Sequence, residues 1–219
     1  RRHPARARAD EIPRPSDLQV PLGDHEAVGR LHHRLQLAVG GQIGRHLLAD
    51  VVAAAATARL AGVAGDAMVR AVEGFRGLEH AMELVADYRG VRFVNDSKAT
   101  NVESARRAIE SFERGLVPIM GGRFKGGDLR KLREPLRERA RAVVVIGEAR
   151  ERVREALLGA VDVWEAASMR EAVERAFELA SPDGIVLLAP ACASFDMFTD
   201  CAERGRVFKQ EVGRIVNAA

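Results

Sequence analysis

The chain of 219 residues is 47% hydrophobic and 30% charged, which suits a globular protein of one large or two modest domains. Its 34 basic and 31 acidic side chains give a net charge of +3, and 5% of its residues are aromatic. With charges this mixed and no basic and aromatic stripe, we expect no nucleic-acid partner. No apolar run approaches the roughly 20 residues that span a bilayer, so we expect no membrane partner either.

The two cysteines indicate a reduced compartment. Cys192 and Cys201 lie close together in the sequence, without a second pair that could build a disulfide framework or a metal site. The basic first residues lead into no apolar segment of a secretion signal. We therefore expect a cytoplasmic, monomeric protein with no metal ligands in these residues. Since the sequence begins without methionine, we also expect it to be part of a longer protein.

The first part of the chain is predicted to be irregular and then helical. Residues 1–30 contain four prolines among scattered charges, which is typical of an irregular arm. An alanine-rich run over residues 46–61 predicts a buried helix that ends near Gly62, and residues 67–75 predict a second helix. This helical pair is expected to pack against another part of the protein.

From Val91 onward, short apolar runs alternate with amphipathic segments. Strands are predicted at residues 91–94, 116–120, 142–146, 161–164 and 184–189. Helices are predicted at residues 102–112, 129–139, 148–158, 169–180 and 199–216. Ser168 and Glu171 form a capping-box pattern at the start of one helix. This alternation predicts an α/β fold with a mostly parallel sheet covered on both faces.

Polar residues crowd into the turn after the first of these strands, at residues 95–101. Asp96, Lys98 and Thr100 stand at a strand-to-helix turn, where backbone N–H groups favour an anion. Thr100 and Glu103 also fit a capping box, so Thr100 either caps the helix or binds a ligand. Capping does not explain Asp96 and Lys98 together, and we interpret these two as functional.

Two further polar segments follow predicted strands, at residues 121–128 and 190–198. Four glycines surround Arg123 and Lys125 in the first, which permits close approach to a carboxylate or phosphate. This segment is neither a Walker A loop nor a GxGxxG fingerprint. The second segment contains Ser194 without a G-x-S-x-G elbow, so ligand binding or capping is favoured over a nucleophile.

In an open parallel sheet, ligands bind beyond the carboxyl ends of the strands. The three polar segments are therefore expected to meet at one edge. Lys98, Thr100, Lys125 and Ser194 would then form a site with two cations and two hydroxyl groups. Such a site suits a dicarboxylate or a phosphorylated compound.

The sequences VRFVNDSKATN, IMGGRFKGGD and LLAPACASFDMF, followed by Glu203-Arg204-Gly205, closely resemble the Mur ligase family. The likeness begins near residue 40 and includes Phe75-x-Gly77-Leu78-x-His80. It implies that residues 31–88 are the mainly helical C-terminal part of the family's central ATPase domain. Residues 89–219 would be its C-terminal amino-acid-binding domain, with a Rossmann-like, doubly wound fold.

The resemblance is to the members that add D-glutamate to UDP-N-acetylmuramoyl-L-alanine in peptidoglycan synthesis. In these, ATP phosphorylates the alanyl carboxylate, and the amine of D-glutamate attacks the acyl phosphate with Mg²⁺ present. Such ligases need positioned cations more than an acid–base pair. The resemblance implies a catalytic role for Lys98, substrate binding by Thr100, Lys125, Ser194, Phe195 and Cys201, and nucleotide binding by His46, Asp50 and Asp96.

This chain also departs from the family's pattern. Leu47 and Asp50 replace two amides that place the adenine, Ala81 replaces an arginine, and Cys201 replaces a common phenylalanine. The Walker A loop, the magnesium ligands and the carbamylated lysine have no counterpart in these residues, so we expect the chain alone to be inactive. The alternative is a non-catalytic binding or regulatory module. A nicotinamide-dependent oxidoreductase would rest on the fold alone, and the absent GxGxxG argues against it.

Overall fold

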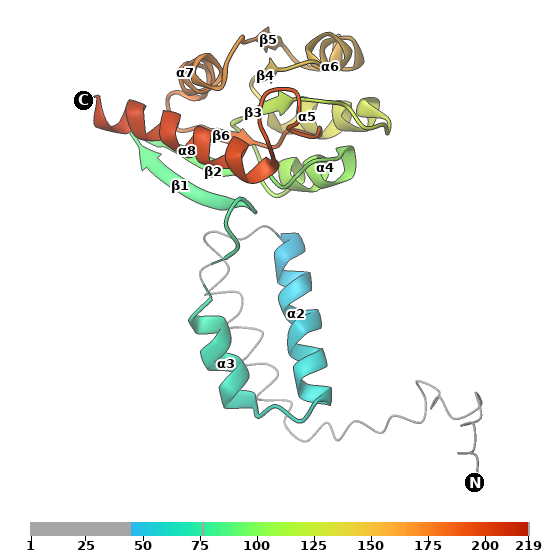
Figure 1. The fold of residues 1–219 in the computed structure, drawn as a ribbon, viewed down its shortest axis with the longest axis vertical. Helices are drawn as coiled ribbons and strands as arrows, with labels where there is room; N and C mark the ends of the chain where they lie inside the picture. Colours follow the sequence, from blue (N-terminus) through green and yellow to red (C-terminus); the bar gives the residue numbers. More distant parts are fainter. Residues whose placement is uncertain (1–44, 76, 219) are drawn as a thin grey trace, which may run out of the picture.

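The computed structural model describes residues 45–75 and 77–218. The predicted arm at residues 1–30 lies outside these residues. Two helices come first, α2 (Arg45–Leu60) and α3 (Gly65–Glu73), within two residues of their predicted bounds. Figure 1 shows this pair standing side by side and away from a second part, in which helices cover both faces of one sheet. None of the helices in the described part of the chain is long and apolar enough to cross a bilayer.

The sheet has six strands in the order β1-β2-β6-β3-β4-β5. β1 pairs with β2 in the antiparallel direction, and all other neighbours are parallel. This arrangement confirms the predicted α/β fold with a mostly parallel sheet. The strands are β1 (Glu83–Tyr88), β2 (Val91–Asn95), β3 (Leu116–Gly121), β4 (Val143–Ile146), β5 (Val163–Glu165) and β6 (Ile185–Leu188).

The sequence did not predict β1, which lies in the range assigned to the mainly helical part. Its sequence ELVADY mixes acidic and apolar residues, and most of its side chains are half-buried at the edge of the sheet. Arg89 and Gly90 connect it to β2 with positive φ angles of 51° and 81°. Two such residues are typical of the tight hairpin turn whose twist matches the strands. The sheet therefore begins before residue 89.

The helices form two layers, each with its own core. The helices α4 (Val102–Glu110), α5 (Arg133–Arg139) and α6 (Arg150–Leu157) cover one face. The helices α7 (Met169–Ala180) and α8 (Cys201–Asn217) cover the other. Figure 1 shows these two groups on opposite sides of the sheet. Successive residues of β4 alternate between the two cores, as expected for a strand buried on both faces.

The predicted helix at residues 129–139 is in fact two elements. A 3-10 turn, η1 (Leu129–Leu132), precedes α5. Pro135 falls in the first turn of α5, where the missing N–H group has no helical partner to lose. The predicted Ser168 cap of α7 is confirmed, because its hydroxyl accepts a 3.2 Å hydrogen bond from the Glu171 N–H. The Glu171 carboxylate accepts the N–H of Ala167 at 2.8 Å, and not that of Ser168 as in a full capping box.

Candidate functional site

The segments that follow β2, β3 and β6 are hydrogen-bonded to one another. The Ala191 N–H donates to the Ala99 carbonyl at 2.9 Å, which joins the first segment to the third. Arg123 and Ala193 exchange backbone hydrogen bonds of 2.9 and 3.0 Å, which join the second segment to the third. The expected meeting of these segments at the carboxyl ends of the strands is therefore confirmed.

Asn101, and not Thr100, caps helix α4. The Asn101 side chain accepts a 2.9 Å hydrogen bond from the Ser104 N–H, and its extended backbone is that of an N-cap residue. The capping interpretation of Thr100 is therefore wrong, because the helix begins one residue later than a Thr100 cap requires. Thr100 is partly exposed next to this cap, and Lys98 is exposed on the same turn.

Asp96 is buried beneath this turn. One oxygen of its carboxylate accepts a 3.2 Å hydrogen bond from the Met82 N–H. Burial raises the pKa of Asp96 to about 6, and the hydrogen bond from Met82 opposes this rise. The carboxylate therefore titrates close to neutral pH.

Sequence reasoning missed a buried polar cluster behind the turn. The Asn95 amide donates to His80 Nδ1 at 2.9 Å and to Glu83 Oε2 at 3.1 Å. Since Nδ1 accepts, the proton of the neutral imidazole belongs on Nε2, which lies 3.6 Å from the Glu79 carboxylate. Burial lowers the pKa of His80, and the His80 carbonyl accepts the Lys98 N–H at 3.1 Å. His80 thus holds the backbone of Lys98.

Arg204 is the side chain that ties the first segment to the third. It is 1% exposed, although it carries a charge on an amphipathic helix. Its guanidinium donates to the Ser97 hydroxyl at 3.0 Å, to the Ser97 carbonyl at 2.9 Å and to the Cys192 carbonyl at 3.1 Å. Burial lowers the pKa of Arg204 to about 10, so it stays charged at neutral pH. The sequence offered one signal for it, the resemblance at residues 203–205.

Glycines bring the second segment into backbone contact with its neighbours. A Cβ atom on Gly121 would lie 2.0 Å from the Ile146 carbonyl oxygen, and one on Gly122 would lie 2.2 Å from that of Ala193. Both residues also have positive φ angles, which side chains rarely tolerate. Farther along, Arg123 forms a two-pronged ion pair with Glu148 at 2.9 and 3.2 Å, while Lys125 is exposed.

The third segment and the start of α8 carry the remaining predicted site residues. Ser194 is 2% exposed, and its carbonyl accepts the N–H groups of Met197 and Phe198 in a tight turn. Phe195 is 61% exposed, so its ring faces outward. Cys201 begins α8, and its carbonyl accepts a 2.6 Å hydrogen bond from the Ser97 hydroxyl. The backbone of Cys201 therefore supports the first segment.

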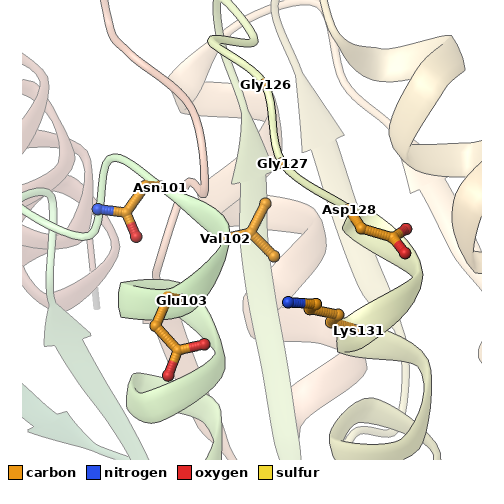
Figure 2. A pocket seen from close by; sticks show the side chains of 7 residues that line it. All are labelled: Asn101, Val102, Glu103, Gly126, Gly127, Asp128 and Lys131. Atoms are coloured by element: carbon orange, nitrogen blue, oxygen red, sulfur yellow. The ribbon is translucent and has the colours of Figure 1, made fainter.

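A hollow of about 230 Å³ opens between α4 and η1 (Figure 2). Figure 2 shows the ammonium group of Lys131 directed across it toward α4. The hollow is smaller than the roughly 300–1,000 Å³ of pockets for drug-sized ligands, so it has room for a small polar molecule. Two of its lining residues, Asn101 and Gly126, directly follow Thr100 and Lys125 in the sequence. Its lining consists of Asn101, Val102, Glu103, Gly126, Gly127, Asp128 and Lys131.

Two predicted nucleotide-binding residues lie in the helical pair, outside the sheet. His46 and Asp50 belong to helix α2, but their side chains lie outside the described residues. Within residues 45–75 and 77–218, no group of three or more His, Cys, Asp and Glu side chains is placed to hold a metal ion.

Comparison with curated proteins gives relatives with one shared name. The chain is 48% identical over 169 residues to the UDP-N-acetylmuramoylalanine--D-glutamate ligase of Chlorobaculum parvum, covering 77% of this chain and 36% of that protein. The ligase of the same name from Solibacter usitatus is also 48% identical, over 77% of this chain and 38% of that protein. The chain thus spans less than half the length of these relatives.

Solved structures share the fold at low identity. The UDP-N-acetylmuramate-alanine ligase MurC of Thermotoga maritima matches with a TM-score of 0.57 and 16% identity, over 78% of this chain and 39% of that chain. The folylpolyglutamate synthase of Mycobacterium tuberculosis, in complex with ADP, matches with a TM-score of 0.57 and 19% identity, over 77% and 40%. Residues 80–192, more than half of the chain, match the family described as Mur ligase, glutamate ligase domain. The chain therefore belongs to the Mur ligase family.

Proposed function

We propose that this chain is the amino-acid-binding part of an ATP-dependent ligase that adds D-glutamate to UDP-N-acetylmuramoyl-L-alanine. The observation that carries the proposal is the joining of three strand-end segments by backbone hydrogen bonds, with Arg204 as a further link between the first and the third. These segments carry Lys98, Thr100, Lys125 and Ser194. The name shared by the relatives at 48% identity supports D-glutamate as the amino acid.

The charges of this edge suit a small dianion. Lys98 and Lys125 are exposed and form no ion pair with an acidic side chain of the described residues. In the proposal, Lys125 and the hydroxyl groups of Thr100 and Ser194 bind the carboxylates of D-glutamate. Lys98 lies on the turn before α4, and it stabilises the negative charge that develops on the transferred phosphate. Phe195 and Cys201 complete the substrate site.

In the proposed reaction, the terminal phosphoryl group of ATP passes to the alanyl carboxylate and forms an acyl phosphate and ADP. The uncharged amine of D-glutamate then attacks the carbonyl carbon, phosphate leaves with the C–O bonding electrons, and the amide nitrogen gives up a proton. Mg²⁺ would stabilise the phosphate charges when bound. Its ligands would come from the central domain, and His46, Asp50 and Asp96 would face the nucleotide.

Calorimetric titration of the chain with D-glutamate tests the binding step. We expect binding that Lys125→Ala weakens about tenfold, the effect of losing one charge-assisted hydrogen bond. Arg130→Ala is the matched control, since it removes a nearby cation, in η1, that Asp128 already pairs at 2.9 Å. If D-glutamate and the UDP-N-acetylmuramoyl-L-alanyl-D-glutamate product both give no heat, the proposal is wrong.

A non-catalytic binding module is the second candidate. It is favoured by Ala81, an uncharged residue at the position where the family usually has an arginine. Ala81 directly follows His80, whose carbonyl accepts the Lys98 N–H of the first segment. Mixing the chain with separately produced N-terminal and central domains of a relative distinguishes the two candidates. ATP-dependent formation of the D-glutamyl product supports the ligase. Binding of D-glutamate without product formation supports the module.

A further inference from the structure

Arg152 is held against the glycine-rich segment by an aromatic ring. Its guanidinium carbon lies 5.1 Å from the centre of the Phe124 ring, a distance typical of a cation–π contact. Phe124 is itself partly buried and packs on the core beneath α4, α5 and α6. Because Phe124 precedes Lys125 directly, this contact places the Arg152 cation beside the segment that carries Lys125.

Two of the acidic side chains near Arg152 in the sequence are already engaged by other arginines. Glu148 accepts both prongs of Arg123, and Glu151 pairs with Arg154 one turn farther along α6. Arg152 forms no ion pair with an acidic residue of the described chain, and the same holds for Lys125. Arg152 and Lys125 are therefore without an ion-pair partner among the described residues, whereas Arg123 and Arg154 each have one.

Both cations act on the third segment. Burial raises the pKa of the Cys192 thiol to about 11, and the positive charges of Arg204, Lys125 and Arg152 oppose this rise. Cys192 is fully buried two residues before Ser194. Lys125 and Arg152 therefore both lie within electrostatic reach of the segment that carries Ser194.

We propose that Arg152, stacked on Phe124 beside Lys125, binds the side-chain carboxylate of the amino-acid substrate and selects an acidic amino acid over its amide. The inference rests on the proposed function and adds a residue to its substrate site. A guanidinium donates two parallel N–H groups, which match the two oxygens of a carboxylate. The aromatic ring limits the motion of the long side chain, so that less conformational entropy is lost on binding.

Titration with D-glutamate and with D-glutamine tests the assignment. Arg152→Gln is expected to weaken D-glutamate binding about tenfold and to leave D-glutamine binding within about twofold, because the amide carries no charge to lose. Arg154→Gln is the matched control. It makes the same charge change on the same helix, at a side chain that already pairs with Glu151. Phe124→Leu keeps an apolar side chain and is expected to lower D-glutamate affinity to a smaller degree.

The outcomes separate the inference from the function on which it rests. If Lys125→Ala weakens D-glutamate binding and Arg152→Gln does not, the inference is overturned and the proposed function stands. Equal weakening of D-glutamate and D-glutamine by Arg152→Gln overturns the assignment to the side-chain carboxylate. If the unsubstituted chain binds D-glutamate no better than D-glutamine, selection by charge is excluded. Absence of any binding by the unsubstituted chain contradicts both proposals.

Discussion

The helical pair α2–α3 differs from the loop edge, which is the edge of the sheet where the three polar segments meet. The difference lies in how far the side chains are buried and hydrogen-bonded. Among the described side chains of α2 and α3, Met68 is the buried one, and Leu60 is 68% exposed at the end of its helix. At the loop edge, by contrast, even the polar side chains of Asn95, Ser97 and Arg204 are buried and hydrogen-bonded. The difference teaches that the edge is held in place by buried hydrogen bonds, whereas the pair offers apolar surface that the described residues do not cover.

Truncating one apolar side chain in the helical pair and one in the domain that carries the edge tests this difference most directly. Ile109→Ala removes a fully buried side chain from the core between α4 and the sheet and is expected to lower the free energy of unfolding by about 3–4 kcal/mol. Leu60→Ala is expected to change it by less than about 0.5 kcal/mol. Urea denaturation followed by circular dichroism measures both. Equal losses would show that the helical pair belongs to the same cooperative core.

Removing the central cation of the edge has the next largest effect. Arg204→Ala leaves the carbonyls of Ser97 and Cys192 buried without their donors, so we expect a loss of about 3 kcal/mol in unfolding free energy. Arg206→Ala, at an exposed position two residues later, is the control and is expected to change it by less than about 0.5 kcal/mol. A small loss for Arg204→Ala would mean that the three segments hold together without it.

Two glycines of α8 allow a matched test of close packing at the edge. A Cβ atom on Gly205 would lie 2.3 Å from His80 Nδ1, whereas one on Gly213 would meet nothing within 4 Å. Gly205→Ala is therefore expected to destabilise the chain by about 2 kcal/mol through overpacking. Gly213→Ala is expected to stabilise it by about 0.5–1 kcal/mol, because alanine favours the helix. Melting temperatures that shift in the same direction would contradict this assignment.

Asp96 gives the smallest effect, and one that depends on pH. Burial raises its pKa from 3.8 to about 6, so the folded chain holds this proton more tightly than the unfolded chain. The stability that the group contributes is fully present below pH 3.8 and is lost as the pH rises through about 6. Asp96→Asn mimics the protonated form, so above pH 7 its free energy of unfolding is expected to be higher than that of the unsubstituted chain by about 1–2 kcal/mol. Urea denaturation of both proteins between pH 4 and pH 8 measures the difference, and a constant difference across this range would contradict the raised pKa.

Prediction from the sequence succeeded where the signal is periodic and local. The bounds predicted for α7, residues 169–180, are those of the structure, and its Ser168 cap forms as expected. The meeting of the three polar segments followed from strand direction alone, because parallel strands place their carboxyl ends at one edge. The roles of Lys98 and Lys125 remain predictions, since they concern a ligand.

Where two residues could serve equally well, the sequence could not choose. Threonine and asparagine are both common helix caps, so the sequence does not show whether Thr100 or Asn101 caps α4. The extended backbone of Asn101 and the hydrogen bond that its side chain accepts show that Asn101 does so. β1 was missed because this edge strand, whose side chains are mostly half-buried, lacks the continuous apolar run of the inner strands. At both places the local sequence is compatible with the observed structure and with the alternative, so the tertiary context decided between them.

The sequence by itself determined the alternation of strands and helices from residue 91 onward, the mostly parallel sheet and the edge at which the three polar segments meet, because side-chain periodicity and turn residues act over short stretches of chain. Only the tertiary structure decided that Arg204 is buried and that His80 packs on Gly205. A charged residue on an amphipathic helix is expected to face solvent, and its burial becomes favourable only where carbonyl groups from distant segments converge on it. Those partners are set by the packing of the whole domain, which local sequence does not encode.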